Sequence, residues 1–357
     1  MYSQRLQRLR ERMSELQLPA LWITDSYNRA YMTGFTGSSG YVLVTLDRAF
    51  LLTDFRYRVQ AKTQAGHCEI VEHASNVKLT ILEILHELGI QQLAFEQTHL
   101  TYQDYLDYTA QLADIQFIPV KSPIYELRII KDTEELRIMQ EAAHLADAAF
   151  SHICTKLQPG ISEKAIALEL EIFIRQQGGT STSFDTIVAS GERSALPHGV
   201  ASERKLQKNE FLTLDFGAYL KGYCSDLTRT VMMGQPSDKH RDVYQIVLEA
   251  QMNVLDHLKP GMTGAQGDAL ARDVIEHYGY GDQFGHGTGH GLGMQIHEAP
   301  RLSKQDMTIL RPGMVVTVEP GIYLPGFGGV RIEDDVLITD TGIQRLTHAN
   351  KQFLIMD

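Results

Sequence analysis

Cysteine is scarce in this chain of 357 residues, and positive charge is in deficit. The three cysteines, Cys68, Cys154 and Cys224, show no CxxC spacing, which argues against a disulfide framework and against a cysteine-rich zinc site. Acidic side chains outnumber basic ones by 44 to 33, which gives a net charge of −11. This balance argues against nucleic acid or an anionic membrane as a partner.

Long apolar runs are also absent. None approaches the roughly 20 residues that cross a bilayer, and the first residues lack the apolar core of a secretory signal. Instead, Leu6, Leu9, Met13 and Leu16 recur at helical spacing. We therefore expect a first structural helix and a soluble, cytoplasmic protein that contacts no membrane.

The patterning predicts two domains. Residues 1–125 alternate helical and extended patterns, which predicts an α/β domain whose mixed sheet is flanked by helices. Asp132 and Glu135 form a capping-box pattern that opens a long helix, and residues 126–357 are expected to form an α+β domain. The phrases LQPGIS and LKPGMT each lie between two helical patterns and suggest an internal duplication.

Acidic residues stand at matching places in two predicted β-hairpins of the second domain. Asp215 and Asp226 flank a turn expected at residues 220–221, and Glu319 and Glu333 flank a turn expected around the glycine of LPGF. Directly opposite residues of a two-stranded ribbon project to the same face, with Cβ atoms about 4.5–5.5 Å apart. We therefore expect Asp215 to face Asp226 and Glu319 to face Glu333.

These acids and one histidine form a candidate site for two metal ions. A dinuclear centre, with ions about 3.5–4 Å apart, needs bridging carboxylates at this separation. Oxygen-rich ligation with a single imidazole suits Mn²⁺, and also Co²⁺ or Zn²⁺. Each acid alone is better interpreted as a solvated hairpin residue, but four at mirror positions favour a metal-dependent hydrolase. The predicted ligands are Asp215, Asp226, His290, Glu319 and Glu333.

Further histidines surround the predicted centre. His286, His290 and His297 lie in GHGTGHGLGMQIHE, and His198 lies in ALPHG. The glycines argue against a zinc-protease helix and against a dinucleotide loop, and we expect them to let the backbone pass close to metals and substrate. Imidazoles with an ordinary pKa of about 6.5 exchange protons in neutral solution.

Period-2 alternation places two more polar residues beside the acids. Thr228 shares the face of Asp226, where its hydroxyl can donate to a ligand. Arg331 shares the face of Glu333, where it can reach a substrate carbonyl or carboxylate. An ion pair with Asp335 on that same face is an equally good interpretation of Arg331 on geometry alone.

The five ligands, with HGTGHGLGMQIHE and VEPGIY, resemble the pita-bread metallopeptidases, and most closely the Xaa-Pro peptidases, aminopeptidase P and prolidase. The resemblance extends over the whole chain, with a creatinase-type domain in the N-terminal half. It implies two divalent metal ions, proton transfer by Glu319, and contacts of His198 and His297 with the scissile carbonyl and the tetrahedral intermediate. It also implies substrate contact by His286, a proline-side role for Arg331, and a homodimer.

From this resemblance we expect hydrolysis of the Xaa-Pro bond at the N-terminus of peptides, in the manner of aminopeptidase P. A prolidase restricted to Xaa-Pro dipeptides is the alternative, because the metal ligands are common to both. Methionine aminopeptidases usually lack this N-terminal domain, and creatinase-like enzymes lack the metal ligands. A non-catalytic pita-bread module that binds peptides is a remote alternative, since such modules generally lose ligands that this chain keeps.

Overall fold

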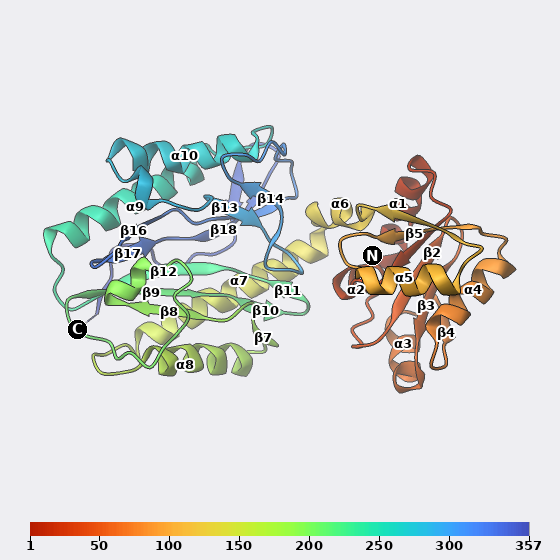
Figure 1. The fold of residues 1–357 in the computed structure, drawn as a ribbon. Helices are drawn as coiled ribbons and strands as arrows, with labels where there is room; N and C mark the ends of the chain where they lie inside the picture. Colours follow the sequence, from red (N-terminus) through yellow and green to blue (C-terminus); the bar gives the residue numbers. More distant parts are fainter. Residues whose placement is uncertain (357) are drawn as a thin grey trace. The chain divides into compact units, whose positions relative to one another are not determined.

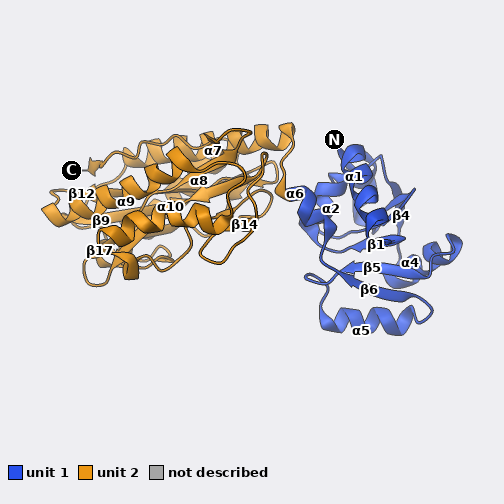
Figure 2. Cartoon of the chain, turned by 90° about the horizontal axis from the view of Figure 1, so that it is seen from above, with its two compact units in different colours: residues 1–128 blue, residues 129–357 orange. Residues whose placement is uncertain are grey.

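The computed structural model describes residues 1–356 and divides into two compact units (Figure 2). Unit 1 covers residues 1–128, and unit 2 begins at Ile129. Both this division and the boundary predicted between residues 125 and 126 fall within α6 (Pro123–Ile129). Within residues 1–356, no helix combines the length and apolar character that crossing a membrane requires.

Unit 1 is built on a six-stranded sheet with the order β4-β3-β2-β1-β5-β6. The central strands β1, β2 and β3 pair antiparallel, whereas β4, β5 and β6 join in parallel, which confirms the predicted mixed α/β domain. The strands are β1 (Ala20–Ile23), β2 (Tyr41–Thr45), β3 (Ala49–Thr53), β4 (Glu69–Glu72), β5 (Gln92–Glu96) and β6 (Gln116–Val120). The other helices are α1 (Tyr2–Glu15), α2 (Ser26–Thr33), α3 (Arg58–Gln64), α4 (Val77–Glu87) and α5 (Tyr102–Gln111).

The first helix forms largely as its apolar spacing predicts. Leu6, Leu9 and Met13 are buried on α1. Leu16 is 42% exposed, because α1 ends at Glu15 and Leu16 is its C-cap. The apolar stripe therefore predicted the helix correctly but extended it by one residue.

Unit 2 packs its strands between two helix pairs (Figure 1). Helices α7 and α8 cover one side of the strands, and α9 and α10 cover the other. The expected capping box opens α7 with Asp132 as its N-cap. A second capping box opens α10 with Thr263 as its N-cap, and Ser162 caps α8. The helices are α7 (Thr133–Cys154), α8 (Glu163–Gln176), α9 (Asp238–His257) and α10 (Gly264–His277).

The strands of unit 2 form two larger sheets and two smaller ones. The larger sheets have the orders β20-β12-β9-β8 and β14-β13-β15-β18-β19. Of the smaller sheets, one pairs β16 with β17 and the other has the order β11-β10-β7. Their bounds are β7 (Ser181–Thr182), β8 (Ile187–Ser190), β9 (Glu210–Phe216), β10 (Ala218–Leu220), β11 (Tyr223–Cys224), β12 (Leu227–Met233), β13 (Gly289–Gly291), β14 (Glu298–Leu302), β15 (Val315–Val318), β16 (Gly321–Leu324), β17 (Gly328–Arg331), β18 (Asp334–Ile338), β19 (Ile343–Arg345) and β20 (Ile355–Met356).

The two helix pairs are joined in the same way, which supports the internal duplication. In each link the helix N-cap makes an isolated β-bridge to a later segment: Ser162 pairs with Lys205, and Thr263 pairs with Ile309. The glycines of both PG turns have positive φ, 94° at Gly160 and 87° at Gly261, a region that only glycine enters readily. The repeated phrase thus marks one turn geometry used twice.

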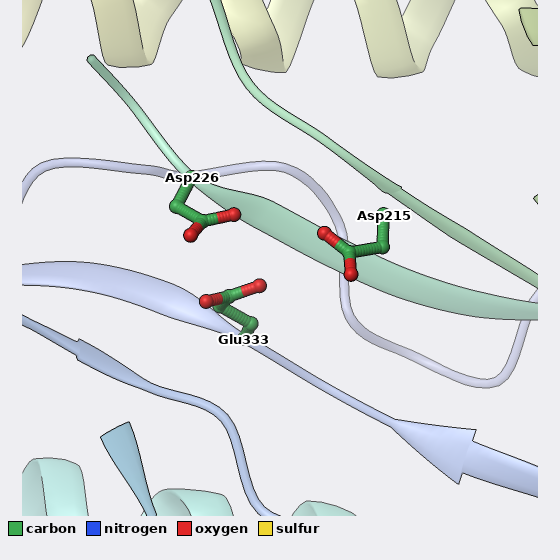
Figure 3. Close-up of side chains that lie close together, drawn as sticks. All are labelled: Asp215, Asp226 and Glu333. Carbon is green, nitrogen blue, oxygen red and sulfur yellow. The ribbon is translucent and has the colours of Figure 1, made fainter. Parts of the chain in front are cut away.

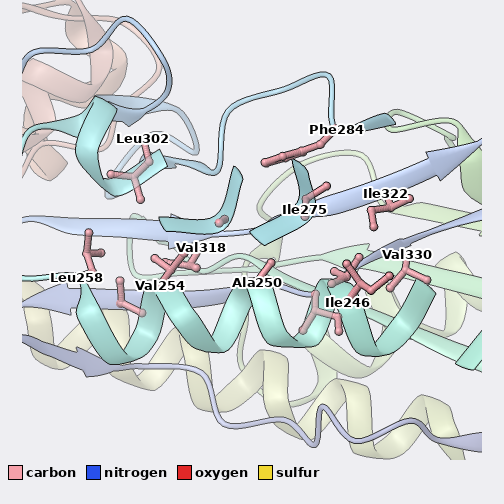
Figure 4. Packing of buried hydrophobic residues seen from close by; sticks show 14 of the residues in the cluster. Ile246, Ala250, Val254, Leu258, Ile275, Phe284, Leu302, Val318, Ile322 and Val330 are labelled. Carbon is pink, nitrogen blue, oxygen red and sulfur yellow. The ribbon is translucent and has the colours of Figure 1, made fainter. Parts of the chain in front are cut away.

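Apolar packing fixes these helices onto the strands. Figure 4 shows one face of α9, with Ile246, Ala250 and Val254, packed against Val318 of β15 and Val330 of β17. Burial of such side chains contributes about 25 cal/mol for each Å² removed from water. Strands β15 and β18, which adjoin Glu319 and Glu333, are therefore backed by a dense apolar core.

The capping box of α10 provides a test of this packing. The Thr263 hydroxyl accepts a hydrogen bond from Gln266 N at 3.2 Å, and the Gln266 side chain accepts one from Thr263 N at 2.9 Å. We expect Thr263→Ala to lower the free energy of unfolding by about 1 kcal/mol, as measured by urea titration with circular dichroism. Thr263→Ser keeps the hydroxyl and should retain wild-type stability; equal losses in both variants would contradict the capping role.

Candidate metal centre

The first acidic hairpin has a register that differs from the predicted one by two residues. Asp215 lies opposite Thr228, not opposite Asp226. The turn is centred on Lys221 and Gly222, whose φ angles of 49° and 89° fit a two-residue turn that needs positive φ at both central positions. A shift of two residues preserves the face, so Asp226 still projects to the same side as Asp215.

The second acidic hairpin has the predicted register. Val318 pairs with Asp334, and Gly321 pairs with Arg331. These two pairs have the same register, so Glu319, which follows Val318, lies opposite Glu333. Gly326 lies at the centre of the turn, with a φ of 75°. The expectation for this pair of acids is therefore confirmed.

The five predicted ligands come together in one place. Oxygen atoms of Asp215, Asp226 and Glu333 lie within 4.8 Å of one another (Figure 3). His290 Nε2 extends this cluster, since it lies 3.4 Å from Glu319 Oε1 and 3.7 Å from Asp226 Oδ2. Strands β9, β12, β13, β15 and β18 bear or directly adjoin these residues, so the site lies where the two larger sheets of unit 2 meet.

Burial and mutual repulsion make these carboxylates costly to ionise without a cation. Burial raises the pKa of Asp226 and of Glu333 well above the ordinary range, and neighbouring acids raise it further. Burial also raises the pKa of Glu319 to about 7. Within residues 1–356, Asp226 Oδ1 is buried without a hydrogen-bond partner. Since buried charges need a partner or a metal, this donor set fits divalent cations.

Burial and ring contacts determine the protonation and the position of three histidines in the site. Burial lowers the pKa of His290 to about 4, so its imidazole is neutral, as a metal ligand must be. The pKa of His286 is lowered to about 4 by burial and by Arg331, and its ring bonds Gly287 O and Tyr323 OH, both at 2.8 Å. His297 packs edge-on against His290, with ring centroids 4.5 Å apart.

A cavity of about 510 Å³ opens over the acids. All five predicted ligands line this cavity, and so does His198. Apolar side chains complete the wall, among them Phe184, Ile187 and Ile296. Every predicted site residue lines this one cavity: His198, Asp215, Asp226, His286, His290, His297, Glu319, Arg331 and Glu333.

Arg331 has a different partner from the one weighed in the sequence. Its Nη2 lies 2.5 Å from Asp215 Oδ2, while Nη1 donates to Tyr323 OH at 2.8 Å. The carboxylate of Asp335 instead accepts from the backbone N of Asp226 at 2.9 Å, so the ion pair considered between Arg331 and Asp335 is absent. Thr228 does support a ligand as expected, donating to Glu333 Oε2 at 2.6 Å.

The glycines of the histidine segment have a steric role that the sequence analysis missed. A Cβ on Gly289 would lie 2.0 Å from the carbonyl oxygen of Thr317, and one on Gly291 would lie 2.2 Å from that of Ala299. The close approach that requires glycine is therefore to neighbouring strands. Gly289 also lines the cavity, but the backbone contacts explain the absence of a side chain.

Several supporting residues were not predicted. Asp334 is buried behind Glu333 and accepts from Arg229 at 2.7 Å, from Gln251 at 2.8 Å and from Lys351 at 2.6 Å. Tyr323 lies on β16, which pairs with the strand that carries Arg331, and strand alternation is the one sequence signal that could have indicated it. The partners of Asp334 come from distant segments, and no local pattern joins them.

The segment with His286 is held by an ion pair on α10. Asp268 and Arg272 bind each other through two contacts, at 2.6 and 2.9 Å. Asp268 also accepts from Thr288 N at 2.9 Å, and Arg272 donates to His286 O at 2.7 Å. This buried pair fixes the backbone on both sides of the histidine.

The raised pKa of Glu319 makes the stability of the metal-free protein depend on pH. The pKa is about 7 when folded and about 4.3 when unfolded, so the stabilisation is present at low pH and is lost as the pH rises through 7. Relative to Glu319→Gln, the metal-free wild type should lose roughly 3 kcal/mol of unfolding free energy between about pH 4 and pH 8.

Urea unfolding in the presence of a chelator measures this difference. Parallel pH profiles for the two proteins would contradict the raised pKa.

Comparison with known proteins agrees with this architecture. Residues 137–340 match metallopeptidase family M24, and residues 5–130 match the creatinase/prolidase N-terminal domain. The predicted creatinase-type domain followed by a pita-bread catalytic domain is therefore confirmed. The Xaa-Pro dipeptidase of Pyrococcus furiosus is 38% identical over 98% of this chain and 99% of its own.

Two solved structures are similar over nearly the whole chain. The Xaa-Pro dipeptidase from Bacillus anthracis is 50% identical, with a TM-score of 0.97 over 99% of this chain and 100% of its own. The X-Pro aminopeptidase from Thermotoga maritima is 36% identical, with a TM-score of 0.91 over 96% of this chain and 99% of its own. The chain belongs to metallopeptidase family M24.

Proposed function

We propose that this enzyme is a prolidase, which hydrolyses Xaa-Pro dipeptides. The expectation from the sequence was aminopeptidase P activity, with prolidase as the alternative. Relatives named Xaa-Pro dipeptidase match the chain from end to end, which favours the alternative. A similar structure carries the name X-Pro aminopeptidase, so the length of the accepted peptide is the property to test.

The chemistry of the bond explains the need for a metal. A peptide bond to proline is a tertiary amide without N–H, and bound divalent ions supply polarisation of its carbonyl and an activated water. The five ligands would hold two such ions, and we expect Mn²⁺, with Co²⁺ or Zn²⁺ as alternatives. A homodimer and a cytoplasmic location stay predictions.

Side chains of the cavity take the remaining roles. Glu319, with a pKa of about 7 in the metal-free protein, is suited to move a proton near neutral pH. His198 and His297 would contact the scissile carbonyl and the tetrahedral intermediate, while His286 would contact substrate. Arg331 would approach the proline side, although its contacts with Asp215 and Tyr323 leave it little freedom.

The observation that supports a dipeptide substrate is a second arginine. Arg301 lines the same cavity and is exposed, and among residues 1–356 its guanidinium has no hydrogen bond or ion pair within the usual distances. Burial lowers the pKa of His297, and the charge of Arg301 lowers it further. Arg301 therefore projects positive charge into the cavity and would bind the carboxylate that ends an Xaa-Pro dipeptide.

Peptide length provides the direct test of the proposal. With added Mn²⁺, the enzyme should hydrolyse Xaa-Pro dipeptides and leave Xaa-Pro-Yaa tripeptides with the same first residues essentially intact. Release of the first residue would be followed by chromatography. Comparable kcat/KM on the two substrates would overturn the dipeptide restriction in favour of aminopeptidase activity.

Replacing Arg301 should weaken this selectivity. A hydrogen bond between charged groups contributes roughly 1.5–3 kcal/mol, so Arg301→Ala should raise KM for Xaa-Pro about tenfold or more. The uncharged Xaa-Pro amide should be turned over equally by both proteins. Arg311→Ala removes an exposed arginine outside the cavity and should leave both substrates unaffected; a similar KM rise there would point to a general effect of charge.

A further inference from the structure

The imidazole of His198 has no support of its own. His198 is exposed at the cavity, and no hydrogen bond to its ring is present in the part of the chain that the structure describes. His286, by contrast, is held through both ring nitrogens. The position of His198 in the cavity is therefore set by the backbone of its loop.

One buried carboxylate holds both ends of that loop. Glu163 is the first residue of α8, and its side chain is fully buried. It accepts from the backbone N and the hydroxyl of Ser190 at 2.9 and 2.7 Å, and from those of Ser202 at 3.0 and 2.6 Å. Arg193 makes an ion pair with the same carboxylate. These donors come from the residues that precede and follow His198.

The backbone of α8 reinforces the attachment. Glu163 N donates to Arg204 O and Lys164 N donates to Ser202 O, both at 3.0 Å. Arg193 Nη2 donates to Val200 O at 2.7 Å, closing the loop on itself. A buried charged network of this kind is rigid when every member is satisfied and costly when one is lost.

We propose that Glu163 is a positioning residue: it fixes residues 190–202 against α8 and so places His198 for the reaction. This inference rests on the proposed function, in which His198 contacts the scissile carbonyl. Glu163 does not line the cavity, so it acts through the loop and not on the substrate. The ion pair of Asp268 with Arg272 does the same for His286 in the other half, but there the ring also has its own hydrogen bonds.

A double-mutant cycle tests the coupling. Glu163→Gln keeps the size of the side chain and removes its charge, and it should lower kcat on Xaa-Pro dipeptides about tenfold, with KM nearly unchanged, because a misplaced group that acts in the transition state costs kcat. In a His198→Ala background, the same substitution should cost less than about twofold. Mn²⁺ affinity, measured by calorimetry, should stay within about twofold of wild type, because no metal ligand is touched.

The matched control is Glu171→Gln on the same helix. Glu171 pairs with Arg175 on the solvent side, where its side chain is 42% exposed, so this variant should retain wild-type activity. If Glu163→Gln does not fold, Ser202→Ala takes its place in the cycle, since it removes one of the donors to Glu163 together with the hydrogen bond that the hydroxyl accepts from Arg204 N. An equal loss of kcat in both backgrounds, or a parallel loss of Mn²⁺ affinity, would overturn the positioning role and indicate general damage to the fold.

Amide hydrogen exchange separates this inference from the proposed function. Glu163→Gln should accelerate exchange within residues 191–202 and leave the strands with the acids as protected as in wild type. A wild-type enzyme without Xaa-Pro hydrolysis would refute the proposed function alone. Unchanged exchange in residues 191–202 would refute the anchoring by Glu163, whatever the activity.

Discussion

Repulsion among buried carboxylates is the constraint on which unit 2 depends. Asp226 and Glu333 lie close together, and burial raises the pKa of both. A fold can keep these carboxyl groups together only if the surrounding structure prevents them from separating. An unfavourable local arrangement persists only where the contacts around it hold it in place. The paired hairpins, backed by apolar cores on two sides, provide that restraint.

The internal duplication explains how one chain brings acids from distant segments together. Each half contributes a helix pair, a PG turn with a β-bridge at the following N-cap, and an acidic hairpin. Each half also uses a buried acid on its second helix, Glu163 or Asp268, to fix a segment with a histidine. The site is thus assembled from two similar scaffolds, and their strands supply the rigidity that metal ligands require.

The sequence predicted the fold class and the identities of the clustered residues, because those depend on local signals. The capping-box pattern of Asp132 and Glu135 predicted the start of α7, and the Gly326 turn fixed the register of one hairpin. The other register was wrong because Lys221 adopts positive φ, which is rare for lysine. The ion pair with Asp335, one of the two interpretations of Arg331, does not form, because the partner of Arg331 is Asp215 on another hairpin. Alternation along one strand gives no information about contacts between sheets.

The two arginines that line the cavity, Arg331 and Arg301, differ in burial and therefore in what each can contact. Arg331 is 4% exposed and bonds Asp215, Tyr323 and Thr228 at once, so moving it would leave several buried polar groups without partners, at a cost of about 1–3 kcal/mol each. It is therefore part of the frame around the acids. Arg301 is exposed at the same cavity and can meet a substrate charge without dismantling anything. Under the proposed function, the choice of substrate length would fall to the exposed Arg301, and a substitution there would change selectivity while the buried frame of the metal centre stays intact.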